Sequence, residues 1–191
     1  TSTEGGVTKA DRARVLALAT AILLLRGGER VGLTGNLLPP RRGEAQAAQM
    51  ALLLCEDHPD DFGAPVADGM LHHSRAVFVS DFLGNMDEVE RALARAADRD
   101  IRGALVQVLD PAEEAFPFDG RTIFESMTGA MRHETLKAGE LRERYLDRLA
   151  ERQARLADLA RLSGWQFHTH HTGESATAAL LWLYTALERH A

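Results

Sequence analysis

Polar side chains follow short apolar runs of this sequence, at the points where each run gives way to a loop. Thr34 ends the first run, Ser80 and Asp81 end the second, and Asp110 ends the third. A fourth run, residues 165–170, is itself interleaved with histidines. Because the carboxyl ends of parallel strands meet at one edge of a sheet, we expect these side chains to share a binding rim.

The hydroxyl and carboxylate of Ser80 and Asp81 are hard oxygen ligands of the kind that Mg²⁺ prefers. Asp81 is therefore a candidate ligand of an incomplete divalent-cation site. The alternative is structural, because serine and aspartate also end strands by forming turns. Asp110 precedes a proline, which is typical of a turn, and we expect Glu113 and Glu114 to be solvated.

A second type of chemistry is suggested by His168 and His170, which are two residues apart and would share one face of a strand. With Asp81 or Asp110 as a further ligand, they could hold zinc or a similar ion in a metal-dependent hydrolase. Histidine near a strand end is equally a hydrogen-bonded polar residue. Neither a glycine-rich phosphate loop nor the G-x-S-x-G motif of serine hydrolases occurs.

Apolar periodicity and turn residues predict how the chain is organised around these side chains. Strands are expected at residues 30–34, 75–80, 101–109 and 165–170, and helices at 8–27, 44–56, 87–98, 138–162 and 177–189. This alternation favours a single α/β domain over residues 1–191, with a three-layer, doubly wound, mainly parallel sheet. Residues 57–73 are expected to form a long loop, and residues 121–125 and 130–134 a hairpin.

The order of the elements also suggests that one strand is missing. Residues 1–6 form a polar lead that runs directly into the first helix. A sheet of this kind normally has a strand before that helix, so the first central strand is apparently missing from this chain.

Composition narrows the functional classes. A formal net charge of −6 argues against nucleic acid as a partner. The longest apolar stretch, residues 15–25, is shorter than the ~20 residues of a membrane span. The single cysteine, Cys55, lies in an apolar run and is expected to be a small buried hydrophobe. One unpaired thiol indicates a reducing, cytoplasmic compartment.

Several segments carry a resemblance to a known family, among them Phe78-Val-Ser-Asp-Phe82, Gln107-Val-Leu-Asp-Pro-Ala-Glu113 and His171-Thr-Gly-Glu174. Together they resemble the bacterial domain-of-unknown-function 58 family, whose members are similar to von Willebrand factor A domains. The resemblance implies a doubly wound α/β fold and a non-enzymatic binding role. It also implies a protein partner, a MoxR-type AAA+ ATPase or its client, in the assembly or maturation of protein complexes.

The resemblance bears on the cation site as well. A-domains often bind a divalent cation through an Asp-x-Ser-x-Ser motif, a threonine from a loop and an aspartate from a later strand. Asp81 matches that last aspartate, whereas the chain has no Asp-x-Ser-x-Ser and residues 39–44 offer no matching threonine. The leading expectation is thus an interaction module that presents the rim around Asp81 and the 57–73 loop to a protein.

Overall fold

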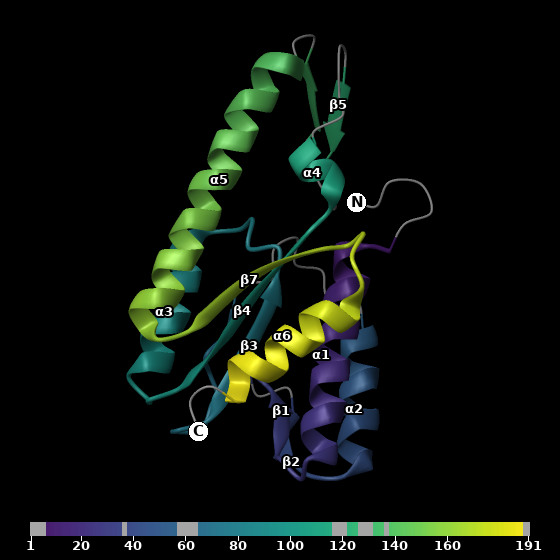
Figure 1. Ribbon diagram of the computed structural model, residues 1–191, viewed down its shortest axis with the longest axis vertical. Coiled ribbons are helices and arrows are strands. Elements are labelled where there is room, and N and C mark those ends of the chain that lie inside the picture. Colours follow the sequence, from purple (N-terminus) through teal and green to yellow (C-terminus); the bar gives the residue numbers. More distant parts are fainter. Residues whose placement is uncertain are drawn as a thin grey trace.

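Three parallel strands form the central sheet of the computed structural model, which describes residues 7–35, 38–56, 65–115, 122–125, 132–135 and 138–188. The strands lie in the order β3-β4-β7, and both pairs are parallel. Their bounds are β3 (Arg75–Ser80), β4 (Arg102–Leu109) and β7 (Gln166–His171). These three strands were predicted, and the carboxyl ends of all three point to the same end of the sheet (Figure 1).

Helices cover both faces of this sheet. On one face α3 (Met86–Ala97) and α5 (Ala138–Ser163) pack against β4 through Leu105. On the other face α1 (Lys9–Arg26) and α6 (Ala176–Glu188) pack against Val106 and Val108. The three-layer α/β arrangement is therefore confirmed (Figure 1).

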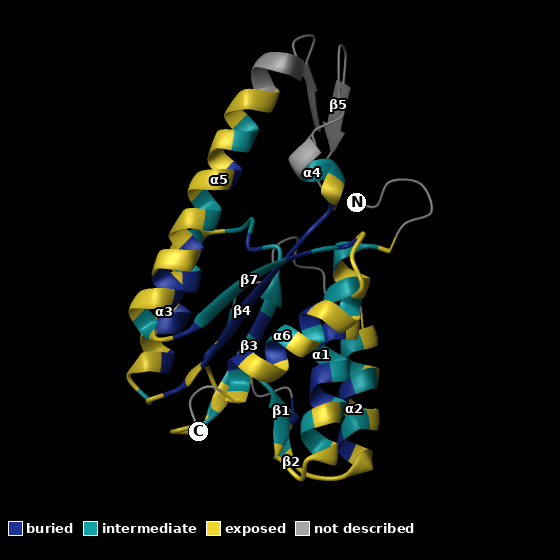
Figure 2. Cartoon of the chain, in the orientation of Figure 1, coloured by how far each residue is buried: buried dark blue, intermediate teal, exposed yellow. Residues whose placement is uncertain are grey.

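β4 is central because its sequence is apolar on both faces. Every residue from 103 to 109 is buried, as Figure 2 shows, which is the pattern of a parallel strand enclosed by helices. β7 differs, because four consecutive residues of this strand, 166–169, are only half-buried. β4 thus anchors the sheet, whereas β7 lies at one edge of the described strands.

The first predicted strand does not join this sheet, and that prediction is wrong. Residues 31–33 form β1 (Val31–Leu33), which pairs antiparallel with β2 (Leu38–Arg41). A parallel connection needs a dozen or more residues, and only four separate these two strands. The Gln46 side chain closes the hairpin by donating to the carbonyl oxygens of Val31, at 2.7 Å, and Pro39, at 2.9 Å.

The remaining elements lie outside the three-stranded sheet. α2 (Glu44–Cys55) lies beside α1, with Met50 buried between them and the hairpin (Figure 1). β5 (Thr122–Glu125) and β6 (Arg132–Thr135) pair antiparallel, as predicted, although the predicted turn between them lies outside the described residues. α4 (Pro111–Ala115) was not predicted. Cys55 is exposed, so its predicted burial is wrong.

Candidate functional site

The carboxyl end of β3 turns sharply at Ser80 and Asp81, and both side chains stabilise that turn. The Ser80 hydroxyl accepts a hydrogen bond from the Phe82 amide at 3.1 Å, and Asp81 Oδ1 accepts one from the Leu83 amide at 3.1 Å. These local bonds support Phe82 in a left-handed conformation, with φ of 51° and a buried ring. The turn fixes the direction in which the Asp81 carboxylate points.

Two longer side chains hold the same turn from neighbouring elements. Gln107 of β4 donates to the Asp81 carbonyl oxygen at 3.0 Å. Arg152 of α5 donates from one guanidinium nitrogen to the carbonyl oxygens of Phe82, at 2.7 Å, and Gly84, at 2.6 Å. A buried amide and a charged donor therefore make the position of Asp81 depend on the sheet and on α5.

Asp110, at the end of β4, is buried and caps the short helix α4. Its Oδ1 accepts from the Ala112 amide at 2.9 Å, and Glu113 Oε2 in turn accepts from the Asp110 amide at 3.0 Å. This arrangement is a variant of the capping box, in which the capping side chain bonds the second amide of the helix rather than the third. Asp110 therefore forms a turn at the end of its strand, which is the structural role expected for a residue before proline.

Lys9 joins the ends of β3 and β4. Its ammonium lies 2.9 Å from Asp81 Oδ2 and 2.6 Å from Glu113 Oε1, and the three side chains are 14%, 23% and 22% exposed. The expectation that Glu113 is solvated is therefore wrong. Burial would lower the pKa of Lys9, but the attraction of Asp81 and the hydrogen bond to Glu113 outweigh it, so the pKa is raised above 10.5. The ammonium stays charged at neutral pH.

The end of β7 is tied to the same region through α1. Arg12 donates to the Thr172 carbonyl oxygen at 2.8 Å, and the Thr172 amide donates to the Leu109 carbonyl oxygen at 2.9 Å. We call the side chains at this edge of the sheet the strand-end rim, defined as Lys9, Arg12, Ser80, Asp81, Asp110, Glu113 and Thr172. Three of the predicted residues, Ser80, Asp81 and Asp110, lie on it.

Thr34 lies at the opposite end of the sheet, and its predicted place on the rim is wrong. The amide of its neighbour Gly35 donates to the Asp68 carbonyl oxygen at 3.0 Å, and the Asp68 carboxylate lies 3.7 Å from Arg95. Arg95 is in the last turn of α3, just before the chain enters the amino end of β4. Thr34 is displaced because its strand belongs to the β1–β2 hairpin.

The two histidines share a face of β7, as predicted, but face α1 and α6. His168 stacks on Trp182 of α6, with ring centroids 4.7 Å apart. His170 is fully buried and neither ring nitrogen has a hydrogen-bond partner. Burial lowers the pKa of both rings, and for His170 the nearby Arg12 adds to this effect. Both imidazole rings are therefore placed as side chains that pack between the sheet and its helices.

The described residues do not form a complete cation site. Within these ranges no group of three His, Cys, Asp or Glu side chains is placed to hold a metal ion. At Asp81 the position facing the carboxylate is taken by the Lys9 ammonium, which a divalent cation would have to displace. The residues around Asp81 in this chain therefore do not fit the divalent-cation site of the A-domains.

The fold and the rim define an α/β protein with a polar, charge-paired surface at the carboxyl ends of its strands. The model of the family described as "Protein of unknown function DUF58" matches residues 2–155, so the chain belongs to that family. Comparisons with curated proteins and with solved structures gave no match. In the described part of the chain, no helix is long and apolar enough to cross a membrane.

Proposed function

We propose that this protein is a non-enzymatic interaction module whose strand-end rim binds another protein. The observation that carries this proposal is the ion cluster of Lys9, Asp81 and Glu113. Its charges are held in fixed positions by the capping box and by the turn after β3, yet about a fifth of each carboxylate side chain remains exposed. Such a preorganised pattern of charge favours specific recognition because little side-chain freedom is lost on binding.

The partner that we propose is a MoxR-type AAA+ ATPase or its client, in the assembly or maturation of protein complexes. Family membership and the three-layer α/β fold support this proposal. The formal net charge of −6 fits a basic partner surface. We propose a cytoplasmic location, which fits the single cysteine, Cys55.

The experiment measures binding to a MoxR-type AAA+ ATPase from the same organism, by calorimetry, with two charge-neutralising variants. Asp81→Asn removes one charge from the rim, and Glu29→Gln removes one from an exposed residue beyond the other end of α1. We expect Asp81→Asn to weaken binding roughly tenfold and Glu29→Gln to leave it unchanged. Equal affinities for the two variants would remove the rim from the interface.

A further inference from the structure

β7 lies at the edge of the sheet, and a hollow opens on each side of it. In the described residues it pairs only with β4, so its other edge presents backbone N–H and C=O groups outward. The hollow towards α5 has a volume of about 320 Å³, and the hollow towards α6 about 270 Å³. Gln166 lines both and Phe167 lines the first, so the two hollows flank the amino end of β7.

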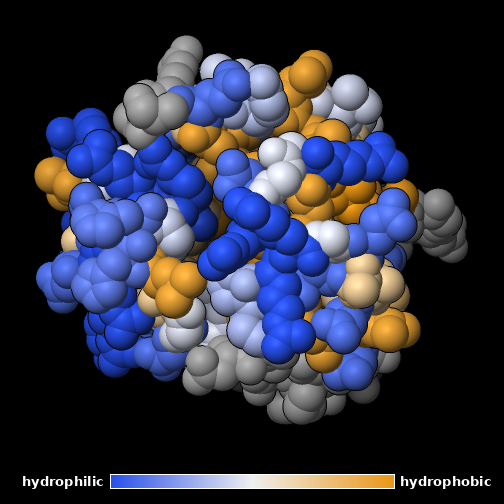
Figure 3. Space-filling view, turned by 90° about the horizontal axis from the view of Figure 1, so that it is seen from below, coloured by the Kyte–Doolittle hydropathy of each residue, from blue (hydrophilic) through white to orange (hydrophobic). Residues whose placement is uncertain are grey.

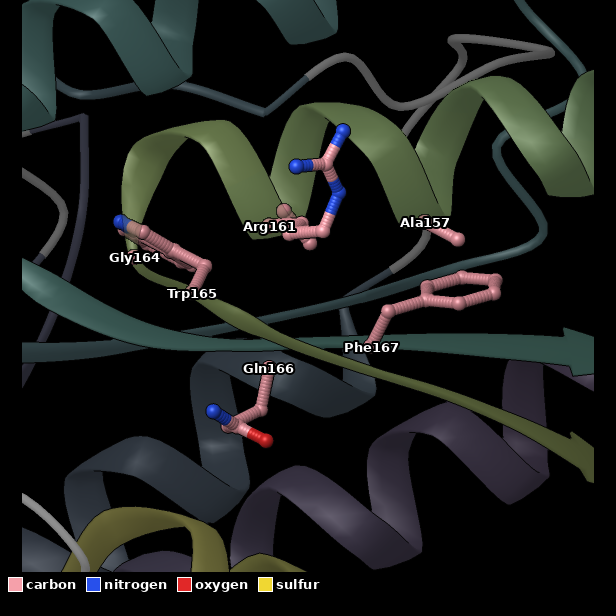
Figure 4. Close-up of a pocket in the computed structure, with 7 residues that line it drawn as sticks. Ala157, Arg161, Gly164, Trp165, Gln166 and Phe167 are labelled. Atoms are coloured by element: carbon pink, nitrogen blue, oxygen red, sulfur yellow. The ribbon is translucent and has the colours of Figure 1, made fainter.

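The hollow towards α5 combines an apolar base with one positive charge. Trp165, Phe167 and Ala157 line it, and Arg161 is the charged residue beside them (Figure 4). Arg161 is 72% exposed, and its ion pair with Asp158, 3.3 Å away on the same helix, is also exposed. Such a pair contributes little and exchanges readily, so Arg161 is available to an incoming carboxylate.

The hollow towards α6 is lined by neutral side chains. Leu181, Trp182, Thr185 and Ala186 form it together with Gln166. Leu181 is 64% exposed there, which leaves a large apolar side chain in water. Figure 4 shows Gln166 pointing away from the α5 side, as the alternation of a strand requires. Figure 3 shows the end of the molecule opposite the rim, where apolar side chains are exposed between hydrophilic ones.

We propose that β7 is a docking edge for an extended segment of a partner protein, in which acidic and apolar residues alternate. The segment adds one strand to the sheet, so its side chains point in turn towards α5 and towards α6. At the amino end of β7, a carboxylate then meets Arg161 on the α5 side, and a neighbouring apolar side chain covers Leu181 and Trp182 on the α6 side. The positive charge in one hollow and its absence from the other select this pattern.

A segment as long as β7 fits this edge. Six residues in extended conformation span about 20 Å, which covers the strand from Gln166 to His171. The rim and this edge are separate surfaces of the same sheet. The inference therefore goes beyond the proposed function and does not depend on it.

The experiment uses the full chain and a fluorescein-labelled peptide of alternating glutamate and valine, equal in length to β7. A matched peptide carries lysine in place of glutamate. Fluorescence anisotropy should show tighter binding of the glutamate peptide. Arg161→Glu should weaken that peptide roughly fivefold and favour the lysine peptide instead. Arg91→Glu, which reverses an exposed charge on α3, is the control and should change neither affinity.

Two further measurements locate the peptide and name the outcomes that would overturn the proposal. Hydrogen exchange should slow at outward-facing amides of β7 and not in β3. Leu181→Lys should weaken both peptides, whereas Asp81→Asn should weaken neither. Equal binding of the two peptides, or no effect of Arg161→Glu, would reject the proposal. A homodimer that protects β7 and excludes the peptide would also reject it, since a second copy would then be the occupant.

Discussion

The strand-end rim and the outer edge of β7, which has no further strand beside it among the described residues, belong to one sheet, yet they use their polar groups in opposite ways. On the rim, side chains bind one another: Lys9 forms ion pairs with two carboxylates, and Asp110 caps a helix. Along β7, the backbone points outward beside two hollows, and the one charged side chain that lines them is paired weakly at the surface. The rim residues, whose chemistry the sequence shows most clearly, therefore bond mainly to one another, whereas the outer edge of β7 presents its backbone groups outward.

The largest effect is expected from a substitution that separates β3 and β4, the two strands whose carboxyl ends build the rim. A Cβ on Gly103 of β4 would lie 1.7 Å from the Ala76 carbonyl oxygen of β3, a contact that only movement of the backbone can relieve. We expect Gly103→Ala to lower the free energy of unfolding by about 3 kcal/mol. Urea denaturation measures the change.

Gly173→Ala is the matched control for that variant. Its Cβ would meet Pro111 Cγ at 3.4 Å, an ordinary contact, and we expect a change within about 0.5 kcal/mol. If the two variants unfold at the same urea concentration, the close approach of β3 and β4 does not limit stability.

A smaller effect is expected from removing the ammonium of the rim. Lys9→Met leaves Asp81 and Glu113 without their shared cation, in a place that is only about one-fifth exposed. Full burial would cost several kcal/mol, but partial exposure to water reduces this, so we expect a loss of about 1–2 kcal/mol. Lys9→Arg keeps the charge and should recover part of the loss.

The pH dependence separates this ion cluster from simple packing. Because the pKa of Lys9 is raised above 10.5 in the folded state, its contribution is intact below that pH and is lost as the pH rises through the folded pKa. The parent protein should lose stability over this alkaline range and Lys9→Met should lose less. Parallel pH profiles for the two proteins would contradict the cluster as a source of stability.

The sequence predicts the part of the fold that is set by local pattern. The apolar runs of β3, β4 and β7 are long enough to be strands, and each is followed by residues that end strands. The prediction for Thr34 was wrong because the apolar run before it resembles the runs of the parallel strands. Only four residues separate that run, β1, from the next strand, β2. That short connection is the signal for an antiparallel hairpin.

The site was only partly predictable because its central residue comes from a distant element. Glu113 could have been found, since Asp110 and Glu113 have the spacing of a capping box. Lys9 gives a weaker signal: a cation in the first turn of a helix opposes the helix dipole, which suggests nearby acids without naming them. The hollows beside β7 depend on how α5 and α6 pack, and no motif marks them.

The smallest effect is expected from His170, which is fully buried on β7. The groups that face it are Arg12 of α1, Glu174, whose carboxylate is 3.5 Å from its Nδ1, and His168 and His171 of the same strand. Burial and Arg12 hold its pKa below the ordinary 6.5, so the folded state binds fewer protons than the unfolded state. Stability should therefore be complete above pH 6.5 and fall as the pH decreases below it.

His170→Met tests this expectation, because methionine fills the site without titrating. At about pH 7.5 we expect its free energy of unfolding to stay within about 1 kcal/mol of the parent, since the imidazole nitrogens make no hydrogen bond that would be lost. At about pH 5 the variant should lose less stability than the parent, although His168 still contributes its own acid dependence. Urea denaturation at both values measures the difference. An unchanged acid dependence would mean that protonation of His170 does not limit folding, and that Glu174 compensates its charge in the folded state.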